Sequence, residues 1–288
     1  MSATTNQTPD NHAPPIRRIL VALNSSPDEL ELIDAALQWA GKLHAELAGL
    51  FVEDITLLEL AEFPFALEVQ RALAQRREVD RQRMERWLRA EARRVRSALE
   101  QRAEGRAVRW RFELARGDIL AETLTAAHQS DLLIISRRFQ DALIQGRRSA
   151  VVAAIIAQAE CAVLIAGKDG HDGSAVYAVV HEGSVARRVL AAAARFAAID
   201  RMPLVVVNTA ATLELCAQQQ TAVRALLAGH PGELRFEDVA AEAPSDWLHG
   251  IDFKRSELLV MDRDSVLADE HSVEALVDEL SCPVLLIN

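Results

Sequence analysis

The chain repeats one pattern of strands and helices, and this repeat limits the folds open to it. The segments DLLIIS (131–136) and ECAVLIAG (160–167) recur as ELLVMD (257–262) and SCPVLLIN (281–288). Their openings also match: RILVALNSSPDE begins at residue 18 and AVYAVVHEGSVA at residue 175. The spacing between matching residues falls from 157 (Asn24 to His181) to 121 (Cys161 to Cys282). A repeat whose loops shorten while its strands persist predicts a duplicated domain.

Strand-length apolar runs alternate with helical patterns in both copies. In the first copy, the expected strands are 19–23, 47–52, 108–114, 132–135 and 162–166, and the expected helices are 28–44, 67–104, 119–128 and 150–159. In the second copy, the strands are 176–180, 204–207, 234–239, 258–261 and 284–287, and the helices are 185–199, 213–228, 245–251 and 272–280. This alternation is typical of a parallel α/β sheet with right-handed crossovers.

Each copy is long enough to form a domain with its own core. We expect a polar, disordered tail over 1–15, a first domain over 16–167 and a second, shorter domain over 175–288. The short join GKDGHDGS (167–174) is rich in Gly and Asp, so the two domains must lie close together. The predicted fold class is α/β, with two tandem domains, each a five-stranded parallel sheet with helices on both faces.

Charge is divided unevenly between the copies. Residues 1–168 hold 23 basic and 23 acidic residues, whereas residues 169–288 hold 9 and 19 and therefore carry the whole net charge of −10. An acidic surface repels the phosphate backbone, so no nucleic-acid partner is expected. No apolar run reaches about 18 residues without a charge, and the N-terminus lacks a basic start and an apolar stretch. Neither a membrane span nor a secretory signal is predicted, and the expected location is the cytoplasm.

The expected helix over 67–104 is unusually rich in arginine. Its apolar residues fall on one face: Met84, Leu88, Val95 and Leu99. Its arginines lie mostly on the other faces and alternate with glutamates: Arg86, Arg89, Arg93 and Arg96, with Glu85, Glu91 and Glu100. We interpret it as a solvated face with ion pairs one turn apart. A surface for an anion or RNA is the alternative interpretation.

Several motifs resemble the universal stress protein family. They are ILVALNSSPDE in the first strand and turn, GLFVED at the end of the second strand, ARGDILAETL before the fourth, DLLIISRR, and CAVLIA in the last strand. The resemblance covers nearly the whole chain as two tandem domains, the first closer to the family pattern. It implies a Rossmann-like fold of the adenine nucleotide alpha hydrolase-like type. It also implies pairing of the two domains through their last strands, and it leaves a homodimer open.

In nucleotide-binding members of that family, an Asp ends the first strand and a G-x2-G-x9-G-[ST] loop holds the phosphates. In this chain, Asn24 replaces the Asp, and the loop positions hold Ser136, Phe139, Ser149 and Ala150. Phe139 puts a ring where backbone must approach phosphate. Polar and basic residues around both turns remain as a candidate nucleotide or anion site: Asn24, Ser25, Ser26, Ser136, Arg137, Arg138, Gly146, Arg147, Arg148 and Ser149. Solvated surface charge is the competing interpretation of the arginines.

The second copy departs further from the nucleotide-binding pattern. His181 takes the place of the Asp and is followed by Glu182, and the loop is five residues shorter. The segment DRDSVLADEH (262–271) holds four acids and one arginine, so it should repel phosphate. We expect no nucleotide there. These acids could make a cation site: Asp262, Asp264, Asp269 and Glu270. A solvated acidic loop is much commoner.

Motifs that carry other chemistry are absent from the sequence. It contains no G-x4-G-K-[ST], G-x-G-x-x-G, H-E-x-x-H, C-x-x-C or G-x-S-x-G. The three cysteines are too few for a disulfide framework, and Cys161 and Cys282 are expected to be small buried hydrophobes. We therefore predict a non-catalytic cytoplasmic stress-response protein that acts through protein contacts and requires no cofactor. The alternative is a nucleotide-responsive sensor or slow ATPase, taking ATP or AMP in the first domain.

Overall fold

Strand β1 (Arg18–Leu23) lies in the middle of the first half of the sheet, and every residue after Arg18 in it is buried. In this computed structural model, β1 pairs in parallel with β2 (Glu46–Asp54) and β6 (Leu132–Ile135). Beyond them lie β5 (Trp110–Gly117) and β7 (Ala162–Ile165), which gives the order β5-β2-β1-β6-β7. Strand β5 is at the edge of the sheet, and its residues are half-buried or exposed.

The second half repeats this order. Its five strands are arranged as β10-β9-β8-β11-β12. In chain order they are β8 (Ala175–Val180), β9 (Leu204–Ala210), β10 (Leu234–Ala240), β11 (Ser256–Asp262) and β12 (Val284–Ile287). Within this half, neighbouring strands are all parallel. The two α/β halves predicted from the repeat are therefore confirmed.

The structure describes residues 15–24, 26, 28–60, 67–70, 75–78, 81–139, 148–168, 173–181, 186–210, 212–240, 253–268, 273, 276 and 278–288. The expected tail up to residue 14 and the expected helix over 245–251 lie outside these residues. So does part of the expected helix over 272–280.

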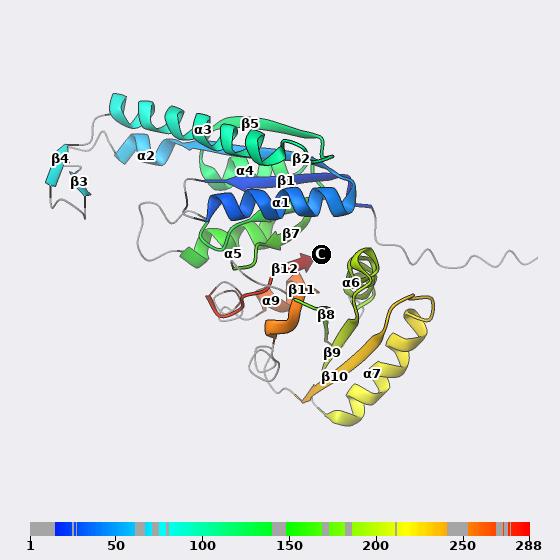
Figure 1. Cartoon of the computed structure of the whole chain (residues 1–288). Coiled ribbons are helices and arrows are strands. Elements are labelled where there is room, and N and C mark those ends of the chain that lie inside the picture. The colour runs from blue at the N-terminus through cyan, green and yellow to red at the C-terminus, as the bar shows by residue number, and fades with distance from the viewer. Residues whose placement is uncertain are drawn as a thin grey trace, which may run out of the picture.

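The two halves meet edge to edge along their last strands. Strands β7 and β12 run antiparallel, with Leu164 opposite Leu285 at the centre of the pairing. One continuous sheet of ten strands results (Figure 1). Pairing of the halves through their last strands, which the resemblance implied, is confirmed.

Helices cover both faces of this sheet. One core, which extends across both halves, contains side chains from α1 (Glu29–Leu43), α3 (Arg81–Ala103) and α6 (Ala186–Asp200), with Val223 of α7 (Leu213–Leu226). The other face packs against α4 (Ile119–Ala127), α5 (Arg148–Gln158), Phe253 of the short helix η1 (Phe253–Arg255), and α9 (Arg263–Leu267). Among the described residues, no helix combines the length and the apolar character needed to cross a bilayer.

Helices α1 and α6 meet across the junction between the halves. The Trp39 ring packs edge-on against Phe196, with centroids 5.2 Å apart. Beside them, the Lys42 ammonium lies 2.6 Å from a carboxylate oxygen of Asp200 and 3.4 Å from one of Glu257. Aromatic packing and ion pairs thus add to the strand pairing in holding the halves together.

The prediction of one long helix over residues 67–104 is wrong in its first part. After the short helix α2 (Ile55–Leu60), the chain forms an antiparallel pair of strands, β3 (Leu67–Gln70) and β4 (Gln75–Glu78). Helix α3 begins only at Arg81. In Figure 1 the pair lies beyond the end of the main sheet. A helix extended to that point would have no sheet to pack against, and packing supplies most of the stability of a helix in water.

Candidate functional site

In a parallel sheet, ligands bind where the carboxyl ends of strands meet and the strand order reverses. In the first half this point lies between β1 and β6, so Asn24 and Ser26 after β1 come close to Ser136 after β6. The Asn24 amide donates to the Arg138 carbonyl at 3.3 Å and joins the two turns. Of the other predicted site residues, Ser25, Gly146 and Arg147 lie outside the described part, as do the side chains of Arg148 and Ser149.

The turn after β1 is rich in oxygen atoms that lack partners. Four buried side-chain oxygens there have no hydrogen-bond partner among the residues that the structure describes: Asn24 Oδ1, Ser26 Oγ, Asp28 Oδ1 and Glu29 Oε1. A buried polar group without a partner costs free energy, so each such atom calls for a partner that the described residues do not supply. Carbonyl and carboxylate oxygens accept hydrogen bonds, so this turn suits a donor such as a hydroxyl or an amino group.

The residues of the turn after β6 are largely buried in the core. Ser136 is buried, and its hydroxyl accepts a hydrogen bond from the Arg138 backbone N–H at 3.0 Å. Phe139, 2% exposed, belongs to the core that also contains Ile155 and Ile156 of α5. At this position the family loop has a glycine, and the ring here fills the core under α5.

Arg137 has a structural environment that the sequence did not predict. Its side chain is buried, and Nε donates to the Ala166 carbonyl at 2.8 Å. The other two guanidinium nitrogens donate to the carbonyls of Leu276 and Cys282 in the second half. Burial lowers the pKa of Arg137 to about 10, so the group remains charged at neutral pH. This guanidinium therefore binds the two halves to each other and is not available to an anion in the loop.

Sequence reasoning missed Glu29, the first residue of α1. It is 1% exposed, and its carboxylate lies 2.8 Å from a guanidinium nitrogen of Arg94 on α3. Burial raises its pKa to about 7, against the opposing effect of Arg94. A signal for this was present in the sequence, because position 29 falls on the apolar face defined by Leu32, Ile33 and Ala36.

Glu29 should make stability depend on pH. Because its folded pKa of about 7 exceeds the reference value of 4.5, the folded state binds more protons between these values, and stability falls as pH rises through them. Glu29→Gln should remove this fall. Relative to the wild type, the variant should gain roughly 3 kcal/mol between pH 5 and pH 8, measured by urea unfolding. Glu31→Gln, on an exposed residue of the same turn, is the control. Parallel pH profiles for Glu29→Gln and the wild type would contradict the assignment.

In the second half, the corresponding point lies between β8 and β11. His181 follows β8, and its Nδ1 is hydrogen-bonded to the Thr209 hydroxyl at the end of β9. Burial lowers the pKa of His181, with Asp262 opposing the shift. The imidazole is therefore mainly neutral near pH 7. Glu182 lies outside the described residues.

Asp262 ends β11 and caps helix α9. Its carboxylate accepts hydrogen bonds from the N–H and the hydroxyl of Ser265, both at 3.0 Å. At this position a nucleotide-binding domain would present backbone donors to phosphate. The buried carboxylate of Asp262 therefore places a negative charge where such a domain would hold phosphate.

Neither a metal site nor a reactive thiol stands out in the described residues. They contain no group of three or more His, Cys, Asp and Glu side chains placed to hold a metal ion. Asp269 and Glu270 of the acidic segment lie outside them. The three cysteines are buried and not in disulfides. Burial raises the pKa of the Cys161 thiol to about 11 and also raises that of Cys282, so both stay protonated at neutral pH.

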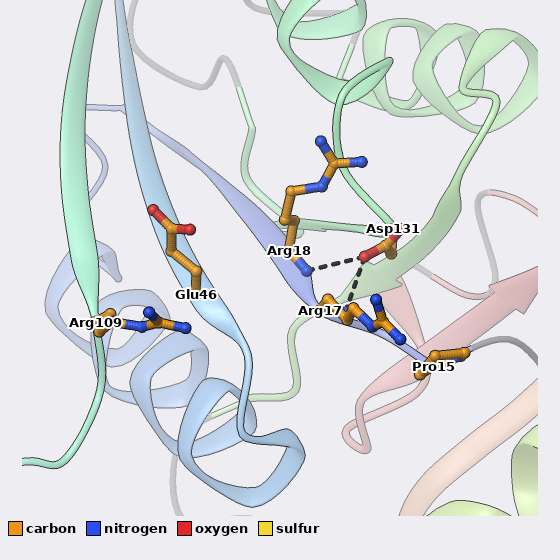
Figure 2. Close-up of a pocket in the computed structure, with 6 residues that line it drawn as sticks. All are labelled: Pro15, Arg17, Arg18, Glu46, Arg109 and Asp131. Carbon is orange, nitrogen blue, oxygen red and sulfur yellow. Dashed lines mark hydrogen bonds between the residues drawn. The ribbon is translucent and has the colours of Figure 1, made fainter.

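A cavity of about 600 Å³ opens at the opposite, amino end of the strands in the first half. It is lined by Pro15, Arg17, Arg18, Glu46, Arg109 and Asp131 (Figure 2). The Asp131 carboxylate accepts the backbone N–H groups of Arg17 and Arg18 at 2.8 and 2.9 Å. Figure 2 shows the side chains of Arg17 and Arg18 pointing away from each other, so they do not enclose an anion. The carboxyl edge remains the candidate site.

A sequence profile of the Universal stress protein family matches residues 15–167. The chain belongs to the universal stress protein family. A universal stress protein from Archaeoglobus fulgidus has a similar structure, with a TM-score of 0.70 at 13% identity over 94% of this chain and 96% of its own. A putative universal stress protein from Pseudomonas aeruginosa gives a TM-score of 0.58 at 18% identity, over 94% of this chain and 93% of its own.

These likenesses over almost the whole length of both chains show the fold, in which two universal stress protein-like halves stand in tandem. A functionally unknown protein from Pseudomonas aeruginosa has the same arrangement, with a TM-score of 0.56 at 18% identity over 94% of this chain and 92% of its own. No curated protein sequence matches the chain.

Proposed function

We propose that this universal stress protein is a non-catalytic, cytoplasmic stress-response protein that acts through protein contacts and has degenerate nucleotide pockets. The observation that carries the proposal is the environment of Arg137. Of the arginines after β6, it lies nearest to the switch point, and its guanidinium donates to carbonyls on both sides of the junction. A residue that could have held phosphate stabilises the scaffold instead.

The second half supports the same proposal. Asp262 presents a carboxylate at the start of α9, and a phosphate placed there would meet a like charge. What both halves retain is the strand order and the paired last strands. A rigid ten-stranded sheet with altered ligand loops is suited to presenting surfaces to other proteins.

One observation favours the alternative, a nucleotide-responsive sensor or slow ATPase that uses the first domain. The unpartnered oxygens of the turn after β1 would be satisfied by the hydroxyl and amino donors of a nucleoside. Phosphate, which brings only acceptors at neutral pH, could accept a hydrogen bond from the Ser26 hydroxyl but not from the three carbonyl and carboxylate oxygens. If the pocket binds a nucleotide, the nucleoside part should therefore supply most of the affinity.

Thermal unfolding with adenosine, AMP and ATP at about millimolar concentration separates the two functions. Under the proposed function, no ligand shifts the midpoint by more than about 1 °C. A site filled at ten times its Kd would add about 1.4 kcal/mol, or roughly 2 to 4 °C. A shift by ATP that Arg147→Ala with Arg148→Ala abolishes would overturn the proposal. A shift by all three ligands that Asn24→Ala abolishes would support the nucleoside-binding alternative.

A further inference from the structure

Helix α3 carries far more positive charge than its packing needs. It has eight arginines and three glutamates in 23 residues. Its buried residues are small or apolar, and four of them belong to the core shared with the sheet: Ala92, Val95, Leu99 and Ala103. On the outward side, four exposed arginines follow one another at spacings of three, four and three: Arg86, Arg89, Arg93 and Arg96. We call these four the arginine ridge; at 1.5 Å per residue they span about 15 Å of helix.

The duplicated half shows that the fold does not require the ridge. Helix α7 occupies the same place, between the second and third strands of its half. It has 14 residues with one glutamate and one arginine. Since both helices cover equivalent strands, packing on the sheet does not explain the arginines of α3.

The ridge is also poorly neutralised within the protein. Arg93 and Arg96 make no ion pair with any described residue, and Arg86 donates to the Gln82 carbonyl, which carries no net charge. Arg89 lies 3.4 Å from Glu85, yet its side chain remains 57% exposed. By contrast, Arg94 beside the ridge reaches the buried carboxylate of Glu29. The charge of the ridge is therefore presented to solvent.

We propose that the arginine ridge docks an acidic segment of another protein. This inference rests on the proposed function and names the chemistry of its partner. Ala90, between Arg89 and Arg93, and Ser97, just after Arg96, are small and exposed, so the backbone of a partner can approach the helix. Trp87, 40% exposed, lies beside Arg86, and Trp and Arg are the residues that most often dominate binding energy at interfaces.

Geometry decides against two other occupants. A nucleic acid gains affinity with each phosphate that is neutralised, and a single row of four arginines about 15 Å long offers few such contacts. The acidic second half of another copy has the right sign, but a contact between two different surfaces of one chain builds open chains of molecules unless its rotation happens to close a ring. A short acidic segment of a different protein needs only the four contacts of the ridge and can form a one-to-one complex.

Fluorescence anisotropy with a labelled peptide tests the proposal. The probe is an Ala-rich helical peptide with four glutamates at spacings of three, four and three, and its comparison has glutamines there. The full-length protein should bind the glutamate peptide at least about tenfold more tightly, which corresponds to 1.4 kcal/mol. The variant R86Q/R89Q/R93Q/R96Q should lose that preference. The control R17Q/R18Q/R109Q/R187Q, with the same change of charge on exposed residues elsewhere, should bind within about twofold of the wild type.

Four outcomes would overturn the proposal: equal losses in both variants, no preference for the glutamate peptide, tighter binding of a 16-nucleotide RNA than of the peptide, or ridge-dependent self-association in sedimentation without peptide. The nucleotide measurement is repeated on the ridge variant. Because the ridge lies outside the turn after β1, a failure of peptide binding leaves that result unchanged. The two proposals can therefore fail separately.

Discussion

Replacing Arg137 by Met is expected to lower the free energy of unfolding by about 3 to 5 kcal/mol, the largest effect of any single change considered for this protein. The methionine keeps most of the volume of the side chain but removes the donors to the Ala166, Leu276 and Cys282 carbonyls. Buried carbonyls that lose a charged donor inside the protein regain no water. Urea unfolding followed by far-UV circular dichroism measures the loss.

Two further substitutions show whether the loss belongs to these contacts. Arg138→Met removes the same charge from the next residue, which is exposed, and should change stability by no more than about 0.5 kcal/mol. Arg137→Lys retains the charge but has fewer donors in a different geometry, so it should fall between the wild type and Arg137→Met. If Arg137→Met and Arg138→Met are equally stable, the guanidinium does not hold the junction.

Gly173→Ala is expected to destabilise the protein by about 2 to 3 kcal/mol. A β-carbon at Gly173 would lie 2.1 Å from the backbone nitrogen of Glu257 and 2.3 Å from its α-carbon. These are backbone atoms of β11, at the point where its register with β8 shifts between Ser256 and Leu258. Neither strand can move aside without breaking the pairing that joins them. Thermal unfolding should show the loss as a lower midpoint.

Gly229→Ala is the matched control, because a β-carbon there would have no atom within 4 Å. It should leave the unfolding midpoint close to that of the wild type. If Gly173→Ala proved as stable as Gly229→Ala, the backbone at Gly173 would not lie as close to β11 as it does in the structure.

The two halves allow one site to be judged against its copy. Both have the strand order of five parallel strands in which the first and fourth lie side by side. At that shared point, the first half has Asn24 and buried oxygens without partners, and the second has His181 bonded to Thr209. Helix α3 of the first half carries eight arginines, whereas α7, in the same place in the second half, carries one. The two copies thus share a scaffold and differ at the surfaces through which a protein recognises other molecules.

Strand positions could be predicted closely because buried parallel strands have continuous apolar sequences. The runs 132–135 and 284–287 match β6 and β12 residue for residue. The start of α3 could not be predicted in this way. Helical spacing continues through residues 67–78, but a helix also needs a surface to pack on, and the sheet ends before that point.

The candidate site was predictable in place but not in detail. The turns after β1 and β6 follow from the strand order, and both had been expected to carry the polar residues. The role of Arg137 depends on Leu276 and Cys282, more than 130 residues further along the chain. No local pattern could distinguish it from Arg138, its exposed neighbour.

By itself, the sequence determined the duplicated α/β architecture, because periodicity and apolar runs are local properties that a repeat displays twice. Only the tertiary structure decided what the charged residues do. It set Arg137 among carbonyls of both halves, placed Glu29 against Arg94 in a buried position, and left the arginine ridge facing solvent. The energy of a charge depends on its distance to other charges and to water, and these distances are fixed only when segments far apart in the chain come together.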